Sequence, residues 1–471
     1  MASKATLNED QKTAFKAIQR FIDHPAADTF VLMGYAGTGK TYLMQHLAKW
    51  LKDNDHQFSM LASTGRAATV LRGKTGFEAT TVHGELYRFN KVDGDEEDIP
   101  DDAPIDKYGQ MTLQFSLRPP DEGKMVYIID EASMLSSELS LNTDTVAFGS
   151  GYLLNDFFDA VNRNKIIFVG DPGQLPPVGQ KFSPALDMEW LSDQSRTAVS
   201  ITLEKIERHN ADNDILVLAS MIRSTANPDY PFTKYPKIPA SNLNNVTIHT
   251  STDALFSNYL EKFKDVGTNG VLAVARSNRM VSFINRAIRR DLYGQLDMPI
   301  QEGEVLMVVQ NNYSVPLTNG DFVIVTTLGE IRLQSNLRFQ SIRVKAILSD
   351  NEYEILLALD VLTSKEVNFT REQSRELMVD FSRRMKKKGI KPNSLRYKEA
   401  MMSDPYLNCL KAKYGYAVTC HKAQGGEWDE VYLFLEKSMY GMPKEELFRW
   451  WYTAVTRAKK QLHLANEWWV R

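Results

Sequence analysis

Short, largely apolar runs recur along the chain, and each is closed by polar or turn-forming residues. They occupy residues 30–33, 59–62, 126–129, 166–169 and 271–274. A run that is apolar at consecutive positions is typical of a strand buried on both faces of a parallel sheet. Apolar residues at helical spacing follow the first run, at Tyr42, Leu43, Leu47 and Leu51. Strands that alternate with helices in this way predict an α/β fold.

The C-terminal part repeats this pattern, with a predicted strand at 430–434 and a predicted helix at 443–458. We therefore expect two α/β units. The segment 84–124 interrupts the first unit with prolines, an acidic run and a short alternating piece, which together predict an insertion with a small hairpin.

A second interruption begins at about residue 302. The segment 302–362 is β-rich and carries a turn signal at Asn319-Gly320, and a polar helical stretch with a basic run from Arg383 to Lys391 follows it. This pattern predicts a small β domain with a basic appendage, inserted into the second α/β unit.

Composition and charge limit the number of domains and the kind of binding partner only modestly. At ~150 residues per domain, 471 residues predict about three domains. The net charge is -3, but eight acids lie between Asp93 and Asp106, so the remainder is net positive and a polyanionic partner is not excluded. We expect this acidic run to form a mobile loop turned away from nucleic acid.

The cysteines and the apolar content bear on the compartment. Cys409 and Cys420 have neither metal-type spacing nor a disulfide framework, which favours a reducing compartment. The N-terminus lacks an apolar signal core, and no run approaches the ~18 apolar residues of a membrane span. We expect a cytoplasmic protein that is neither exported nor membrane-spanning.

The segment from Gly34 to Thr41 satisfies the phosphate-loop pattern G-x-x-x-x-G-K-[ST] between a predicted strand and a predicted helix. Its backbone N–H groups would close around phosphate oxygens, Lys40 would reach the terminal phosphates, and the Thr41 hydroxyl would bind Mg²⁺. The predicted ATP-binding residues of this loop are Gly34, Ala36, Gly37, Thr38, Gly39, Lys40 and Thr41.

Two further strands end in residues that suit phosphoryl transfer. Asp130 and Glu131 follow the run 126–129, where one carboxylate can hold Mg²⁺ and the other can orient or deprotonate a water. We assign the metal to Asp130. The run 166–169 leads into a loop rich in glycine and proline, from Gly170 to Gly179. Taken alone, the acidic pair could cap a helix, and the loop could be an ordinary turn.

In order along the chain, these segments resemble the motifs of superfamily 1 helicases of the 5′-to-3′ branch, which contains RecD, Pif1 and the phage Dda helicases. The similar segments are 34–41 (motif I), 63–68 (Ia), 81–83, 130–133 (II), 170–179 (III), 203–208 (IV), 416–429 (V) and 452–458 (VI). The length leaves room for two motor units and two insertions, which is most similar to the Dda type.

The resemblance implies two RecA-like parallel-sheet motor domains with ATP between them. It places the first in residues 1–83 and 124–200, with a hairpin insertion, the pin, at 84–123. It places the second in residues 201–301 and 411–471, with an SH3-like β insertion and the basic appendage at 302–410.

The resemblance also implies roles for single side chains around ATP. Gln11 would read adenine, unless it is an ordinary helix glutamine, and Gln174 would sense the γ-phosphate. Arg208 and Arg457 would act as arginine fingers, and the alternative for both is a salt bridge. Glu427 would accept a hydrogen bond from the ribose.

Single-stranded DNA would cross the tops of both units. The predicted contacts are Thr64, Arg66, Thr81, His83, Asn278, Arg279, Thr419 and His421. Lone members such as His83 and Asn278 could instead be capping residues. The basic run could be a solvated face or a nonspecific grip on DNA. The wedge that splits the duplex would be Tyr87, Phe89, Phe115 or Pro119, for which the alternative is core packing.

These expectations together describe an ATP-dependent DNA helicase that moves 5′ to 3′, needs Mg²⁺ and unwinds a duplex. Its predicted partners are single-stranded DNA, fork DNA and single-strand binding or replication proteins. We expect it to act as a monomer in phage replication or recombination, in the host cytoplasm. Two alternatives stay open. One is a nucleic-acid-stimulated NTPase that displaces proteins without unwinding, and the other is an RNA helicase.

Overall fold

The computed structural model describes residues 7–93, 112–140, 146–206, 213–226, 235–294, 298–312, 314–392, 394–466 and 468–470. The acidic run beyond Asp93 and the predicted finger Arg208 lie outside these residues, so both stay predictions. Within the ranges described, every helix is too short or too polar to cross a lipid bilayer.

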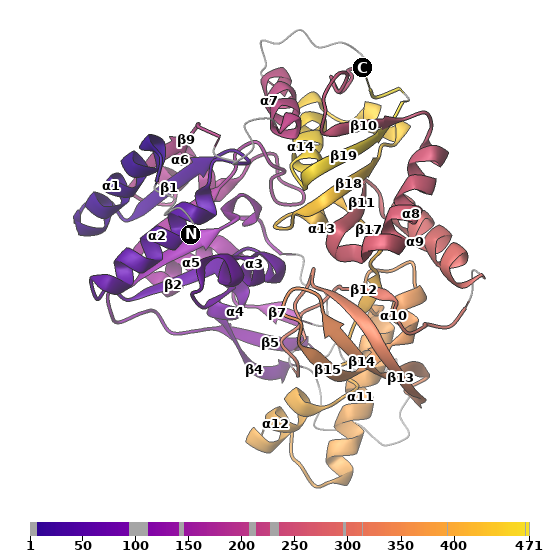
Figure 1. The fold of residues 1–471 in the computed structure, drawn as a ribbon. Coiled ribbons are helices and arrows are strands. Elements are labelled where there is room, and N and C mark those ends of the chain that lie inside the picture. Colours follow the sequence, from indigo (N-terminus) through magenta and orange to yellow (C-terminus); the bar gives the residue numbers. More distant parts are fainter. Residues whose placement is uncertain are drawn as a thin grey trace.

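The first lobe is built on a six-stranded parallel sheet of order β3-β2-β6-β8-β1-β9 (Figure 1). Successive residues of a strand point to opposite faces, so Phe30 and Leu32 join one hydrophobic core and Val31 joins another. The strands are β1 (Thr29–Gly34), β2 (Phe58–Ala62), β3 (Ala79–Thr81), β6 (Val126–Asp130), β8 (Lys165–Gly170) and β9 (Ala198–Leu203). Burial on both faces explains why these runs are apolar throughout.

Helices cover both faces of this sheet. They are α1 (Glu9–Asp23), α2 (Lys40–Asp53), α3 (Gly65–Thr75), α4 (Val82–Leu86), α5 (Leu153–Val161) and α6 (Met188–Asp193). Short 3₁₀ turns at Ala132–Met134 and Pro184–Leu186 complete the lobe.

The second lobe has a five-stranded parallel sheet of order β10-β19-β18-β11-β17. Figure 1 shows its pink and yellow strands side by side, although more than a hundred residues separate β11 from β17 in sequence. The strands are β10 (Val246–His249), β11 (Val271–Ala275), β17 (Ala417–Thr419), β18 (Trp428–Phe434) and β19 (Ala458–Ala465). The helices are α7 (Asp214–Ala226), α8 (Thr252–Gly270), α9 (Asn278–Tyr293), α13 (Cys420–Ala423) and α14 (Lys444–Val455), with a 3₁₀ turn at Lys437–Gly441. The two parallel sheets confirm the predicted α/β class with two RecA-like cores.

An antiparallel sheet of order β15-β14-β13-β12-β16 is inserted in the second lobe. Its strands are β12 (Val305–Val308), β13 (Phe322–Gln334), β14 (Leu337–Ala346), β15 (Glu352–Ala358) and β16 (Ala412–Tyr414). The tight turn between β13 and β14 uses Ser335 and Asn336, both at positive φ, whereas Asn319-Gly320 precedes β13. Because β16 pairs with β12, this sheet extends past residue 410.

The helices α10 (Leu359–Thr363), α11 (Arg371–Lys387) and α12 (Leu395–Ser403) follow β15. The last two form a small core around Phe381 and Tyr397. The first lobe reaches this core through Phe89, which packs against it from β4 (Tyr87–Asp93). Strand β4 pairs with β5 (Thr112–Leu117), and β5 pairs in turn with β7 (Val146–Phe148), which lies outside the segment 84–123.

Candidate nucleotide and nucleic-acid site

The phosphate loop joins β1 to α2, as the sequence predicts. Gly37 and Gly39 have φ of 82° and 78°, a conformation that side chains with a Cβ rarely adopt. The Thr38 hydroxyl donates to the Tyr35 carbonyl at 2.9 Å. Lys40 begins α2, and its ammonium folds back over the loop to donate to the Gly34 carbonyl at 2.6 Å. The helix N-terminus and this lysine place positive charge at the loop.

The acidic pair lies at the carboxyl end of β6. Asp130 ends the strand, and its side chain accepts a hydrogen bond from the Glu131 N–H. The backbone of Glu131 has a φ of 50°. Burial raises the pKa of Asp130. Burial and the Asp130 charge raise the pKa of Glu131 to about 7, against the opposing charges of Arg457 and Lys40. One carboxylate therefore experiences cations from both lobes.

Arg457 is the second-lobe member of this group. The residue is 4% exposed. It donates to the Thr453 carbonyl at 2.9 Å and to the Gly426 carbonyl at 3.1 Å. These bonds fix the guanidinium where it lowers the pKa of Glu131. The structure thus brings Lys40 and Arg457, from different lobes, into the electrostatic environment of Glu131.

The loop after β8 carries Gln174 into the contact between the lobes. The next residue, Leu175, is fixed by two polar contacts with the second lobe. The Leu175 N–H donates to the Thr453 hydroxyl at 2.9 Å, and Gln424 donates to the Leu175 carbonyl at 3.2 Å. The Oε1 of Gln174 is buried and accepts no hydrogen bond from the described residues. A buried acceptor without a donor suits a residue that accepts a hydrogen bond from a water.

A tyrosine completes this contact. The Tyr452 hydroxyl accepts from the Ala36 N–H at 2.9 Å and donates to Asp171 Oδ2 at 2.7 Å. We call the whole contact the P-loop seam. It consists of Ala36, Glu131, Asp171 and Leu175 of the first lobe, and Gln424, Tyr452, Thr453 and Arg457 of the second.

The predicted nucleic-acid residues follow the carboxyl ends of parallel strands in both lobes. Three threonine hydroxyls cap the helices that begin there. Thr64 accepts from Ala67 N–H at 3.2 Å, and Thr81 from Gly84 N–H at 3.0 Å. Thr419 accepts from Lys422 N–H at 3.4 Å. Thr64 lies two residues after β2, and Thr81 and Thr419 are the last residues of β3 and β17, so all three lie at carboxyl ends of strands.

The remaining predicted contacts differ in exposure. Asn278 and Arg279 are exposed at the start of α9, after β11. His83 packs against Tyr87 and Phe148, and burial lowers its pKa. Burial also lowers the pKa of His421. Neutral imidazoles can offer hydrogen bonds to nucleic acid but little charge.

Comparisons with known proteins agree with this geometry. Residues 6–229 match the family described as AAA domain, and residues 414–465 match the UvrD-like helicase C-terminal domain. The RecBCD enzyme subunit RecD of Buchnera aphidicola is 22% identical over 363 residues, 72% of this chain and 53% of that protein. The ATP-dependent DNA helicase PIF1 of Emericella nidulans is 25% identical over 206 residues, 43% of this chain and 24% of that protein. The chain belongs to the RecD/Pif1-like helicases of superfamily 1B.

It is thus an ATP-hydrolysing helicase, as the motifs predict. An uncharacterized protein of Acanthamoeba polyphaga mimivirus is 22% identical over 96% of this helicase and 98% of that protein. The helicase spans about half of RecD and a quarter of PIF1. The crystal structure of Pif1 helicase from Candida albicans superposes with a TM-score of 0.47 and 14% identity, over 98% of this chain and 95% of that one.

Arg66 of this helicase has a different environment from the one expected for a nucleic-acid contact. Its side chain is 6% exposed, and its guanidinium lies 4.3 Å from the Trp428 ring and 5.0 Å from the Phe322 ring. Burial lowers the pKa of Arg66 to about 10, against the attraction of Asp321. In this arrangement of the lobes, Arg66 faces aromatic rings rather than solvent.

Close backbone contacts surround Arg66. A Cβ on Gly65 would lie 1.7 Å from the Thr318 hydroxyl, and one on Gly425 would lie 3.0 Å from the Ala67 Cβ. We call this contact the α3 seam. It consists of Gly65, Arg66 and Ala67 of the first lobe, and Thr318, Phe322, Gly425, Gly426 and Trp428 of the second.

Two more predicted nucleotide residues contact protein groups. The Gln11 oxygen accepts from the Asn8 N–H in the capping box of α1, and its amide donates to the Thr38 carbonyl at 3.2 Å. Gln11 therefore holds α1 against the phosphate loop. Glu427 lies 3.5 Å from the Lys74 ammonium, which joins the two lobes beside the α3 seam. The predicted roles of Gln11 and Glu427 toward adenine and ribose stay predictions.

The structure divides the wedge candidates. Tyr87 and Phe115 are buried, and the Tyr87 hydroxyl donates to Asp156 at 2.8 Å, so both serve core packing. Phe89 packs on the core of α11 and α12. Pro119 is exposed. Of the four, Pro119 has the accessibility that stacking on a base pair requires.

Sequence reasoning missed three side chains of the site. Tyr452 and Asp171 lie inside recognised motifs, but a tyrosine in the apolar α14 is indistinguishable from core by pattern alone. Arg223, in α7, lies with its guanidinium 3.5 Å from the centre of the Tyr35 ring in the phosphate loop. No motif flags Arg223, because only the packing of α7 on the first lobe brings it there.

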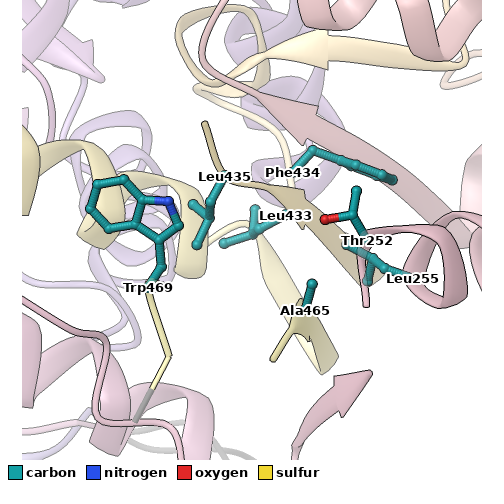
Figure 2. Close-up of a pocket in the computed structure, with 7 residues that line it drawn as sticks. All are labelled: Thr252, Leu255, Leu433, Phe434, Leu435, Ala465 and Trp469. Carbon is teal, nitrogen blue, oxygen red and sulfur yellow. The ribbon is translucent and has the colours of Figure 1, made fainter. Parts of the chain in front are cut away.

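A small cavity lies elsewhere in the second lobe, between Thr252, Leu433, Ala465 and Trp469 (Figure 2). Its volume of about 10 Å³ holds one water at most. No residue of the P-loop seam or the α3 seam lines it.

Proposed function

We propose that this helicase couples ATP hydrolysis to 5′-to-3′ movement along single-stranded DNA, and that it separates the strands of a duplex. Three features support the proposal: the order of its motifs, its Dda-like length and its relatives named RecD and PIF1. By the same analogy, we propose a role in phage replication or recombination.

The observation that carries the proposal is the shared electrostatic environment of Glu131. Lys40 belongs to the first lobe and Arg457 to the second, and both oppose the rise in the pKa of this carboxylate. ATP bound between them would be contacted from both sides. Its binding then favours a closed arrangement and its hydrolysis an open one, which moves one lobe relative to the other.

The donor set fits Mg²⁺. The Thr41 hydroxyl and the Asp130 carboxylate supply oxygen ligands, which Mg²⁺ prefers. Burial raises the pKa of Asp130 because its negative charge is poorly compensated there, and a divalent cation would relieve that cost. When bound, Mg²⁺ neutralises phosphate charge.

The chain's own residues supply the remaining chemistry. Glu131 orients the attacking water and accepts its proton, and we assign Gln174 to the sensing of the γ-phosphate. Arg457 spreads the charge of the transition state with a rigid guanidinium fork, and we assign Arg208 the same role.

We further propose that single-stranded DNA lies across the carboxyl ends of the strands of both sheets. Phosphates and sugars suit the helix N-termini at Thr64, Thr81 and Thr419 and the exposed side chains of Asn278 and Arg279. Contacts to phosphates and sugars position a strand without reading its base sequence. The partners would be single-stranded and fork DNA, with single-strand binding or replication proteins, and the monomer would be active.

The test is ATP-dependent unwinding of forks that bear only a 5′ tail or only a 3′ tail, prepared in DNA and in RNA. We expect the 5′-tailed DNA fork alone to open, with Lys40→Ala as an inactive control. ATP hydrolysis without opening of any fork would favour a protein-displacing NTPase. Opening of the RNA fork alone would favour an RNA helicase, and opening of the 3′-tailed DNA fork would contradict the direction.

A further inference from the structure

The Tyr452 hydroxyl bridges two parts of the first lobe that take part in nucleotide chemistry. It accepts the Ala36 N–H of the phosphate loop and donates to the Asp171 carboxylate. A phenol has one proton to donate, so the donor of this hydroxyl is fully used. Burial and the Asp171 charge raise the pKa of Tyr452, which keeps the hydroxyl protonated and able to donate.

The ring is fixed as firmly as its hydroxyl. Tyr452 is buried in the core of the second lobe, so it moves with α14. A Cβ on Gly173 would lie 3.1 Å from a ring carbon of Tyr452, so only glycine lets this loop approach the ring so closely. A movement of the second lobe therefore displaces the hydroxyl that is hydrogen-bonded to the phosphate loop.

Asp171 connects the Tyr452 hydroxyl to the loop that contains Gln174. It is fully buried, and its Oδ1 accepts from the Gly173 N–H at 2.9 Å. Beyond Gln174, the Leu175 N–H donates to Thr453, the neighbour of Tyr452 on α14. Both ends of the Gln174 segment are thus attached to one helix of the second lobe.

The Ala36 N–H is a single donor in a loop whose amides hold phosphate oxygens. A phosphate oxygen and the Tyr452 hydroxyl are acceptors of the same kind, so they compete for it. We propose that Tyr452 is a positioning residue whose hydroxyl competes with a terminal phosphate for the Ala36 N–H. This proposal rests on the proposed function. A terminal phosphate that takes the Ala36 N–H releases Tyr452, and the Gln174 loop and α14 then shift relative to the phosphate loop.

Tyr452→Phe keeps the ring and removes the bridge. Tyr432→Phe is the matched control, because Tyr432 is a buried tyrosine of the same lobe whose hydroxyl donates to Asn258 at 2.8 Å, with no contact to either seam among the described residues. We measure kcat and KM for ATP with and without an oligo-dT strand. For Tyr452→Phe we expect KM to fall about 2- to 10-fold, the worth of one hydrogen bond. We also expect the stimulation of kcat by oligo-dT to fall toward one, while Tyr432→Phe matches wild type.

A higher KM with unchanged stimulation would overturn the proposal, because Tyr452 would then be an ordinary binding contact. Thermal unfolding checks that both variants fold. Should Tyr452→Phe not fold, Asp171→Asn weakens the bridge from its other end, since one amide oxygen replaces two acceptors. Unchanged stimulation in Asp171→Asn would also overturn the proposal. A wild-type chain without oligo-dT stimulation would overturn the proposed function as well, whereas silent variants in a stimulated background overturn only the role of Tyr452.

Discussion

The two seams between the lobes are built from different contacts. The P-loop seam consists of single hydrogen bonds and charges at a loop that binds phosphate, such as Tyr452 to Ala36. The α3 seam consists of aromatic rings around Arg66 and of backbone in van der Waals contact at Gly65 and Gly425. A phosphate oxygen can take the place of a hydrogen-bond acceptor in the P-loop seam, but no solute can take the place of the close packing in the α3 seam. The P-loop seam therefore consists of contacts that a bound phosphate can displace, whereas the α3 seam consists of contacts that it cannot.

The largest effect is expected from Arg457 in the P-loop seam. Arg457→Ala should lower kcat for ATP hydrolysis about 10³- to 10⁵-fold and leave nucleotide binding nearly intact, because an arginine finger acts on transition-state charge. Steady-state hydrolysis and titration with a fluorescent nucleotide measure the two quantities. Lys459→Ala is the control, since Lys459 pairs with Asp429 and is 44% exposed. A kcat within tenfold of wild type would contradict the finger role.

Gly65 tests the α3 seam by overpacking. Gly65→Ala places a Cβ 1.7 Å from the Thr318 hydroxyl, and we expect a loss of about 1–3 kcal/mol in the free energy of unfolding. Gly73→Ala in the same helix has no atom within 4 Å of its Cβ, and it should gain about 0.5–1 kcal/mol. Denaturant titration measures both.

A compensating change sharpens the result for Gly65. The three atoms nearest to a Cβ there belong to the Thr318 side chain. The double variant Gly65→Ala with Thr318→Gly should therefore recover part of the lost stability. No recovery would mean that the destabilisation does not come from the α3 seam.

Arg66 separates a packing role from a nucleic-acid role. Arg66→Met should lower the free energy of unfolding by about 2 kcal/mol, because it removes a desolvated cation–π contact with Trp428. We expect the KM for ATP to stay unchanged, in contrast to Tyr452→Phe. Denaturant titration and oligo-dT binding test this. Weaker oligo-dT binding at unchanged stability would instead make Arg66 the nucleic-acid contact that the sequence predicts.

The smallest effect concerns pH. A base must be deprotonated to act, and the pKa of Glu131 is raised to about 7, so kcat/KM for ATP should rise about tenfold from pH 6 to pH 8. A glutamate of ordinary pKa would give a flat profile over this range. The profile is measured in constant-ionic-strength buffers, with Glu131→Gln expected to be slow and flat. A flat wild-type profile would contradict the raised pKa.

Much of the nucleotide site follows from local sequence. The glycines at 37 and 39 and the strand before them fix the phosphate loop, and the acidic pair falls at the end of β6 as predicted. The environment of Arg66 does not follow from local sequence. Its motif identifies the arginine, but the aromatic rings around it belong to Phe322 and Trp428, hundreds of residues away. The same is true of Tyr87 and Phe115, since burial decides whether an aromatic ring can stack on a base.

The sequence by itself determined the alternation of buried strands and helices and the phosphate loop, because these depend on residues within one turn or one strand of each other. It also determined the family, because the motifs keep their order along the chain. Only the tertiary structure decided that Tyr452 reaches Ala36 and Asp171, that Arg223 covers Tyr35, and that Arg66 is buried. Each of these contacts joins residues far apart in sequence. Such contacts exist only after two lobes with separate cores pack against each other, and no local pattern records that packing.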